Sequence, residues 1–170
     1  MSLIYLSVGS NIDASRNIKS ALDSLEQQFG PLLISSVYES KALGFQGKNF
    51  LNLAVALESH LPINQTLNVL KKIEDLQKRD RSAPKFSDRT MDIDMLCVDD
   101  LKGNFDGISL PRAEILENAF VLLPLAEIAP DCIHPCTGLT FSNHWQVFNK
   151  DLQSLWKVDF VWRGKQISFR

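Results

Sequence analysis

Apolar residues in the first part of the chain recur with two different periods, which predict a strand followed by a helix. Residues 3–8 form an apolar run rich in β-formers that stops at a Gly-Ser-Asn turn, as a strand does. Residues 16–29 repeat apolar side chains at helical spacing and end at Gly30-Pro31. This second pattern is typical of an amphipathic helix.

The following segments predict two strands, a helix and a further strand. Residues 32–38 and 50–57 are rich in β-formers, and the glycine-containing stretch between them is too long for a tight hairpin, so we expect a binding loop there. Residues 65–79 place apolar side chains on one helical face, and residues 91–98 alternate as a strand does. The order βαββαβ predicts an α+β, ferredoxin-like sandwich, in which two helices cover one face of a sheet.

The last third of the chain predicts helical and extended additions to this sandwich. Residues 113–118 and 121–128 have helical patterns, and the tail carries three tryptophans that we expect to be buried. The chain has 170 residues, of which 45% are hydrophobic, and this apolar surface suffices for one compact core. We therefore expect a single domain over residues 1–170, with its core in residues 3–130 and a C-terminal extension over residues 131–170.

Charge and targeting signals exclude several classes of protein. A formal net charge of −2 provides no general cationic surface, so we expect no nucleic-acid partner. The N-terminus lacks a charged leader region, and no apolar run approaches the length of a membrane span. We therefore expect a soluble, cytoplasmic protein that does not associate with membranes.

Three cysteines form neither an even disulfide set nor a paired zinc motif, which fits a reducing compartment. We expect buried or idle thiols. Because Cys132, His134 and Cys136 alternate and His144 follows nearby, a zinc site remains open as an alternative.

Two acidic residues in the last predicted strand are the first candidates for chemistry. Asp92 and Asp94 are two positions apart, so both carboxylates point to the same face of a strand and repel each other unless a cation lies between them. Mg²⁺ binds one or two carboxylates together with phosphate oxygens. The alternative is that the two aspartates only protect an exposed strand edge from aggregation.

A cluster of cationic residues precedes this acidic pair. Arg79, Arg81, Lys85 and Arg89 lie in a polar, proline-containing segment that predicts a loop. Positive charge near a magnesium site stabilises a migrating phosphoryl group, and arginine binds phosphate through two parallel hydrogen bonds. A solvated loop is the alternative for these residues, but Arg89 directly precedes the acidic strand, where it can orient phosphate. Cations beside anions predict a polyanionic ligand.

Three segments carry a resemblance to a known family. Residues 5–11 (YLSVGSN), 50–58 (FLNLAVALE) and 89–96 (RTMDIDML) resemble, in sequence, order and spacing, those of 6-hydroxymethyl-7,8-dihydropterin pyrophosphokinase. The resemblance implies a folate-pathway enzyme that transfers the diphosphate of ATP to the hydroxymethyl group of a dihydropterin and releases AMP. It also implies two Mg²⁺ ions at Asp92 and Asp94, and we expect a monomer.

The resemblance further assigns roles to individual residues. On the pterin side, Asn52 would bind the ring by hydrogen bonds, Phe50 and Phe120 would flank it, and residues 40–43, including Ser40 and Leu43, would line the pocket. A buried amide between aromatic faces suits a flat heteroaromatic ring, although Asn52 could also be a satisfied core amide. On the nucleotide side, the resemblance assigns ATP binding or loop closure to Glu74, Arg79, Arg81 and Lys85, and catalysis to Arg79 and Arg89 together with the two aspartates.

The nucleotide side also holds departures from the family pattern. Arg112 and Ala113 stand where the family has histidine and tyrosine, and Asn118 stands where a phosphate-contacting arginine is expected. We expect Arg112 to bind the nucleotide phosphates instead. The alternative function is a divergent pterin-binding relative with lost or altered ATP-dependent activity. A second alternative is an interaction module, since the fold alone specifies no activity.

Overall fold

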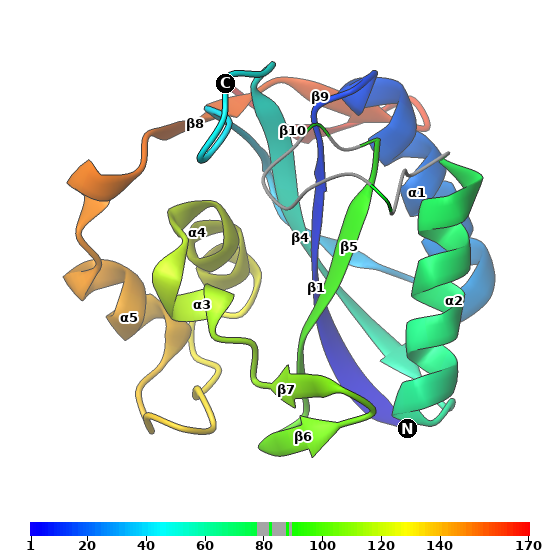
Figure 1. The fold of residues 1–170 in the computed structure, drawn as a ribbon, viewed down its shortest axis with the longest axis vertical. Coiled ribbons are helices and arrows are strands. Elements are labelled where there is room, and N and C mark those ends of the chain that lie inside the picture. The colour runs from blue at the N-terminus through cyan, green and yellow to red at the C-terminus, as the bar shows by residue number, and fades with distance from the viewer. Residues whose placement is uncertain (78–81, 83–87, 89) are drawn as a thin grey trace.

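The computed structural model describes residues 1–77, 82, 88 and 90–170, and six strands of this part of the chain form an antiparallel sheet at the centre of the molecule (Figure 1). The strands lie in the order β5-β1-β4-β3-β8, and the short β2 pairs with β4. Their bounds are β1 (Ser2–Ser10), β2 (Leu33–Ile34), β3 (Val37–Ser40), β4 (Phe50–Ser59), β5 (Asp92–Val98) and β8 (Leu155–Val158).

The order of the strands confirms the α+β, ferredoxin-like sandwich. Four neighbours in the sheet, β5, β1, β4 and β3, are the strands that the sequence predicts, and each adjacent pair among them is antiparallel. The two predicted helices, α1 (Ala14–Phe29) and α2 (Ile63–Leu76), cover one face of this sheet side by side (Figure 1). The periodicity of the sequence therefore predicts the core elements to within a few residues.

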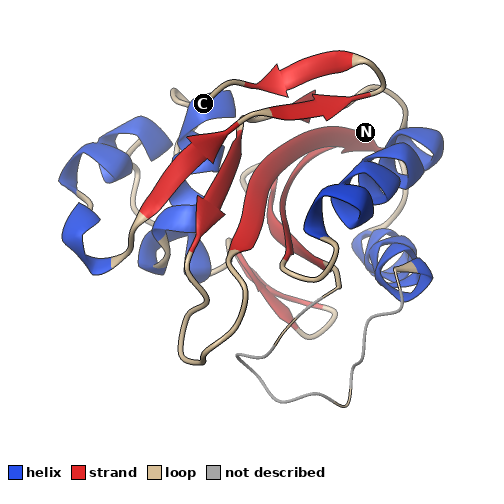
Figure 2. Ribbon diagram, turned by 90° about the horizontal axis from the view of Figure 1, so that it is seen from above, coloured by secondary structure: helices blue, strands red, loops and turns tan. Residues whose placement is uncertain are grey.

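Alternation along β1 separates two apolar cores, one on each face of the sheet. Ile4, Leu6 and Val8 are buried against the α1 and α2 side. Tyr5 points to the opposite face and belongs to a second buried cluster with Phe141. Successive side chains of a strand point to opposite faces, so a strand that is apolar at nearly every position needs a cover on both sides. Figure 2 shows helices on both sides of the sheet.

The second face is covered by elements from the last third of the chain. α4 (Ala119–Ile128) packs on β4 and β3 and buries side chains on most of its surface. The remaining elements are β6 (Gly103–Phe105), β7 (Ile108–Leu110), α3 (Glu114–Glu117), α5 (Phe141–Val147), η1 (Lys150–Leu152), β9 (Phe160–Trp162) and β10 (Lys165–Ser168). No helix among the described residues combines the length and the apolar composition required to cross a membrane.

The C-terminal tail is built into the sheet, because β8 pairs with β3 as its outer neighbour. The expectation that the tail buries its aromatic residues is wrong for Trp156, whose side chain keeps 40% of its surface exposed. Its indole N–H instead donates to Glu39 on the neighbouring strand. An indole has a single hydrogen-bond donor, its ring N–H. Because Glu39 accepts from this N–H at the strand edge, the ring can stay exposed.

Ser168 joins the end of the chain to the sheet, and its removal should destabilise the fold. Its buried hydroxyl accepts a hydrogen bond from the Val37 main-chain nitrogen (2.9 Å) and donates to the Val158 carbonyl (2.6 Å). Ser168→Ala leaves the Val37 N–H without this partner, so we expect the free energy of unfolding to fall by about 1 to 3 kcal/mol in urea titrations. Ser154→Ala is the matched control, because Ser154 is exposed. Equal midpoints for the two variants would contradict the prediction.

Candidate functional site

A cavity of about 300 Å³ lies on the α4 side of the sheet. β1 contributes Ser7 and Gly9 to its floor, two and four positions after the buried Tyr5, and β5 contributes Asp92 and Asp94. The strand register places Asp94 opposite Ser7 and Asp92 opposite Gly9. The predicted common face of the two aspartates is therefore the floor of a cavity.

Asn52 joins this floor from β4, opposite Gly9. It is buried, and its Nδ2 donates to the Ser40 hydroxyl (2.8 Å) and to the Tyr38 carbonyl (3.3 Å). A main-chain carbonyl only accepts, so the Tyr38 contact fixes which end of the amide is nitrogen. Asn52 Oδ1 is then the end that can accept a hydrogen bond from a ligand. A Cβ on Gly9 would lie 3.4 Å from this oxygen, so position 9 borders the accepting end of the amide.

Aromatic and aliphatic side chains form the wall next to Asn52. Phe50, Phe120 and Leu43 line the cavity together with Ser40, so the structure brings all five predicted pterin-side residues around one space. Phe45 also lines it and packs edge-on against Phe50, with ring centroids 6.4 Å apart and an interplanar angle of 89°. Sequence reasoning missed Phe45, although an aromatic residue inside a polar, glycine-containing loop is a usable signal.

The opposite end of the cavity is charged. Arg112 Nη2 lies 4.0 Å from Asp94 Oδ1, and Arg112 Nε donates to Glu114 Oε2 at 3.2 Å. Arg112 and Glu114 both line the cavity. Glu114 was not predicted from the sequence, because no local pattern shows that the segment after β7 lies against β5, where the Arg112 main-chain nitrogen donates to the Leu96 carbonyl. Arg112, which was predicted to bind the nucleotide phosphates, therefore lies beside the acidic pair.

Asp94 has an unusual protonation equilibrium. Burial and, after it, the negative charge of Asp92 raise the pKa of its carboxyl to about 7, although Arg112 acts to lower it. The side chain keeps 40% of its surface exposed, but it opens into the cavity, where protein atoms replace much of the surrounding water. Asp94 resists ionisation beside the charge of Asp92, so this pair provides a fitting set of ligands for a hard divalent cation.

The raised pKa of Asp94 predicts that the metal-free chain loses stability as pH rises. Between the ordinary value of 3.8 and about 7, the folded chain keeps a proton that the unfolded chain has lost. The folded state binds more protons in this window, so the free energy of unfolding falls with rising pH. Urea titrations at about pH 5 and about pH 8 measure the fall, which should be smaller in Asp94→Asn. An equal pH dependence in both proteins would contradict this assignment.

Other predicted site residues lie away from the cavity or outside the described residues. Glu74 is buried on α2, and its Oε2 accepts a hydrogen bond from the Ile93 main-chain nitrogen at 3.0 Å. Its charge also contributes to the raised pKa of Asp94, but Glu74 does not line the cavity. Its nucleotide-binding role stays a prediction. The predicted residues that fall outside the described part of the chain are Arg79, Arg81, Lys85 and Arg89.

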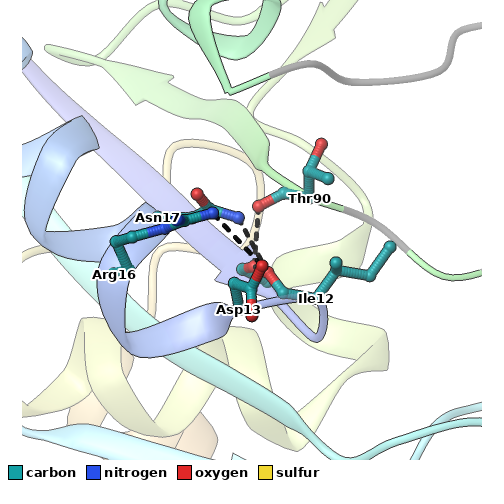
Figure 3. Close-up of polar contacts among 6 residues, drawn as sticks. Ile12, Asp13, Arg16, Asn17 and Thr90 are labelled. Atoms are coloured by element: carbon teal, nitrogen blue, oxygen red, sulfur yellow. Dashed lines mark hydrogen bonds and ion pairs between the residues drawn. The ribbon is translucent and has the colours of Figure 1, made fainter.

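Side chains at the end of β1 and shortly after it form hydrogen bonds that hold neighbouring segments of the site in place. Ser10 Oγ donates to the carbonyl of Thr90 (2.6 Å), two residues before β5. Asn17 Nδ2 donates to the carbonyl of Ile12 (2.7 Å), as Figure 3 shows. Asn11 Nδ2 donates to Asp88 Oδ1 (2.6 Å). The Gly-Ser-Asn turn that ends the first strand in the sequence therefore positions the start of the acidic strand.

Cys132, His134 and Cys136, the alternating residues considered for a zinc site, lie in a connecting segment and on no named strand. The segment between α4 and α5 makes one isolated bridge, and His134 Nδ1 accepts from the Cys136 main-chain nitrogen at 3.1 Å. Within the described ranges, no group of three or more His, Cys, Asp or Glu side chains is arranged to hold a metal ion. Asp92 and Asp94 are a pair and not a group of three. A magnesium ion held by two carboxylates keeps its other coordination positions for phosphate oxygens and water.

Comparisons with known proteins agree on one family. The family model described as 7,8-dihydro-6-hydroxymethylpterin-pyrophosphokinase (HPPK) matches residues 5–130. Proteins named 2-amino-4-hydroxy-6-hydroxymethyldihydropteridine pyrophosphokinase from Aquifex aeolicus and Porphyromonas gingivalis are each 35% identical; the matches cover 79% of this chain and 85% and 95% of those proteins. The folic acid synthesis protein fol1 of Pneumocystis carinii is 30% identical over 98% of this chain, which spans 23% of that longer protein.

Solved structures are similar in fold. A crystal structure of an HPPK-DHPS in complex with substrates has a TM-score of 0.70 at 14% identity, covering 89% of this chain and 44% of that chain. A Plasmodium falciparum HPPK-DHPS with pteroate has a TM-score of 0.74 at 14% identity, covering 98% of this chain and 48% of that chain. The chain thus spans less than half the length of these structures.

Proposed function

Since this chain belongs to the 7,8-dihydro-6-hydroxymethylpterin-pyrophosphokinase family, we propose that it transfers a diphosphate from ATP to 6-hydroxymethyl-7,8-dihydropterin and releases AMP. The observation that carries this proposal is the composition of one cavity. Its apolar end combines aromatic walls with the buried amide of Asn52, and its other end holds Asp92, Asp94 and Arg112. This arrangement suits a flat ring at one end and a phosphate chain at the other.

Asp92 and Asp94 would hold two Mg²⁺ ions together with the phosphates of ATP. Their carboxylates point into the cavity from one strand, and the difficulty of ionising Asp94 beside Asp92 is relieved when a cation binds between them. Bound magnesium neutralises phosphate oxygens and so favours attack at phosphorus. We propose that two ions bind there.

The residues of the chain contribute mainly by positioning. Asn52 Oδ1 accepts a hydrogen bond from the pterin, and Phe50 and Phe120 limit how the ring can turn. This orientation directs the hydroxymethyl group toward the acidic end of the same cavity. Arg112, 4.0 Å from Asp94, lies within reach of phosphate oxygens that would bind there. Holding both reactants in line accounts for much of the acceleration in such transfers, and no covalent intermediate is needed.

Four residues of the predicted loop, together with Glu74 of α2, complete the proposal on the nucleotide side. Arg79 and Arg89 would stabilise the transferred group, and Arg81, Lys85 and Glu74 would bind or enclose the nucleotide. We also propose that the protein acts as a monomer in the cytoplasm. Sedimentation or gel filtration tests the monomer directly.

A two-part experiment tests the function. Calorimetry with Mg²⁺ and an unreactive ATP analogue measures nucleotide binding, and AMP release from ATP with the dihydropterin measures turnover. Binding with AMP release supports the proposal. Pterin binding without AMP release would instead identify a divergent relative with lost or altered use of ATP, and an absence of both would indicate an interaction module.

A further inference from the structure

One side chain of the C-terminal tail contacts the wall of the cavity. Gln153, which follows η1, accepts a hydrogen bond at Oε1 from the main-chain nitrogen of Ala119 (2.7 Å) and donates from Nε2 to Oδ1 of Asn118 (3.0 Å). Asn118 itself lines the cavity. Gln153 therefore connects the tail to a cavity residue that lies 35 positions earlier in the chain.

The directions of these two hydrogen bonds determine the orientation of both amides. A main-chain N–H only donates, so Ala119 requires the carbonyl oxygen of Gln153. Gln153 then presents its amide nitrogen to Asn118, which requires the carbonyl oxygen of Asn118. Asn118 is left with an amide nitrogen that can donate two hydrogen bonds to a ligand. Within the described part of the chain, this nitrogen has no hydrogen-bond partner.

The position of Asn118 indicates which ligand atoms it meets. Its main-chain nitrogen donates to the carbonyl of Glu114. Glu114 accepts a hydrogen bond from Arg112 (3.2 Å), which lies 4.0 Å from Asp94 at the charged end of the cavity. Under the proposed function, this end receives the phosphate chain. A phosphate oxygen at neutral pH is chiefly an acceptor, so it pairs with an amide nitrogen and is repelled by an amide oxygen.

We infer that Gln153 is a positioning residue that holds the Asn118 amide as a hydrogen-bond donor to an oxygen of the phosphate chain. This inference rests on the proposed function for the identity of the ligand. The tail is held in place next to Gln153, because β8 begins two residues later and pairs Leu155 with Ser40 of β3. The C-terminal tail thereby fixes the orientation of one side chain of the cavity wall.

Two substitutions of Gln153 separate this role from packing. Gln153→Glu keeps the size of the side chain and an acceptor for Ala119, but its second oxygen faces Asn118 and forces that amide to turn its oxygen toward the ligand. Gln153→Ala only releases Asn118, which can then adopt either orientation. We expect the dissociation constant of a Mg²⁺ complex of α,β-methylene-ATP to rise about tenfold in Gln153→Glu and about threefold in Gln153→Ala.

Two controls decide the source of the effect. Gln146→Glu adds the same charge to an exposed side chain of the tail and should leave the dissociation constant unchanged. In an Asn118→Ala background, Gln153→Glu should no longer weaken binding, because the amide that it reorients is absent. Thermal unfolding of each variant establishes that the chain is folded during the measurement.

The outcomes are distinct. A Gln153→Glu variant that binds as well as the wild type, or better than Gln153→Ala, would overturn the inference, as would an effect that persists without Asn118. In the AMP-release assay, the KM for ATP should rise with little change in kcat, since the hydrogen bond forms before and during transfer. If no AMP is released although the nucleotide binds and the variants differ as expected, the proposed function fails and the amide orientation stands. If all variants release AMP equally, the proposed function stands and the inference about the amide of Asn118 fails.

Discussion

Replacing Asp94 by alanine should greatly weaken magnesium-dependent nucleotide binding. Asp94 and Asp92 point into the same cavity from β5, and removing one carboxylate leaves the other to hold the cation beside a polyphosphate. Losing one partner of a close charge pair costs about 2 to 5 kcal/mol, which corresponds to a loss of affinity of about 30-fold to more than 1,000-fold. Calorimetry with Mg²⁺ and an unreactive ATP analogue measures it.

Asp100→Ala is the matched control for this result. Asp100 is an exposed aspartate shortly after β5, so its removal changes the net charge equally without touching the cavity. Asp94→Asn, which keeps the shape of the side chain, should lose nearly as much affinity as Asp94→Ala. Affinity like that of the wild type in Asp94→Ala would show that the acidic pair does not hold the metal.

The second large effect is expected on the pterin side, at Asn52. Asn52→Leu keeps the volume of the side chain but removes the amide that is held by Ser40 and the Tyr38 carbonyl. A bound pterin would then bury a polar group without a partner, which costs about 1 to 3 kcal/mol. We expect the dissociation constant for the dihydropterin to rise about 5- to 150-fold, as measured by fluorescence titration.

A graded series tests the reason for that loss. Ser40→Ala removes one hydrogen bond to the amide but leaves the Tyr38 carbonyl to orient it, so we expect a loss of about two- to tenfold. Asn104→Leu, at an exposed position of β6, should have no effect. If Asn52→Leu binds the pterin normally while it remains folded, Asn52 is only a core amide, as the sequence allowed.

Much of the candidate site was predictable because its chemistry follows from positions along single strands. Asp92 and Asp94 share a face on any strand, and Asn52 is the polar residue in an apolar run. The family resemblance added the aromatic residues, and the structure places all of them around one cavity. Glu114 and Phe45 were missed because no local pattern reveals which residues of a connecting segment turn inward.

Sequence periodicity by itself determined the strands and helices of the core, their order and the common face of the acidic pair, because these depend on neighbours a few positions apart. Tertiary structure alone decided that β8 joins the edge of the sheet and that Arg112 lies beside Asp94. It also decided that Gln153 orients Asn118. These contacts join residues 18 to more than 100 positions apart. Such pairs meet only after the chain has folded, so no local repeat in the sequence records them.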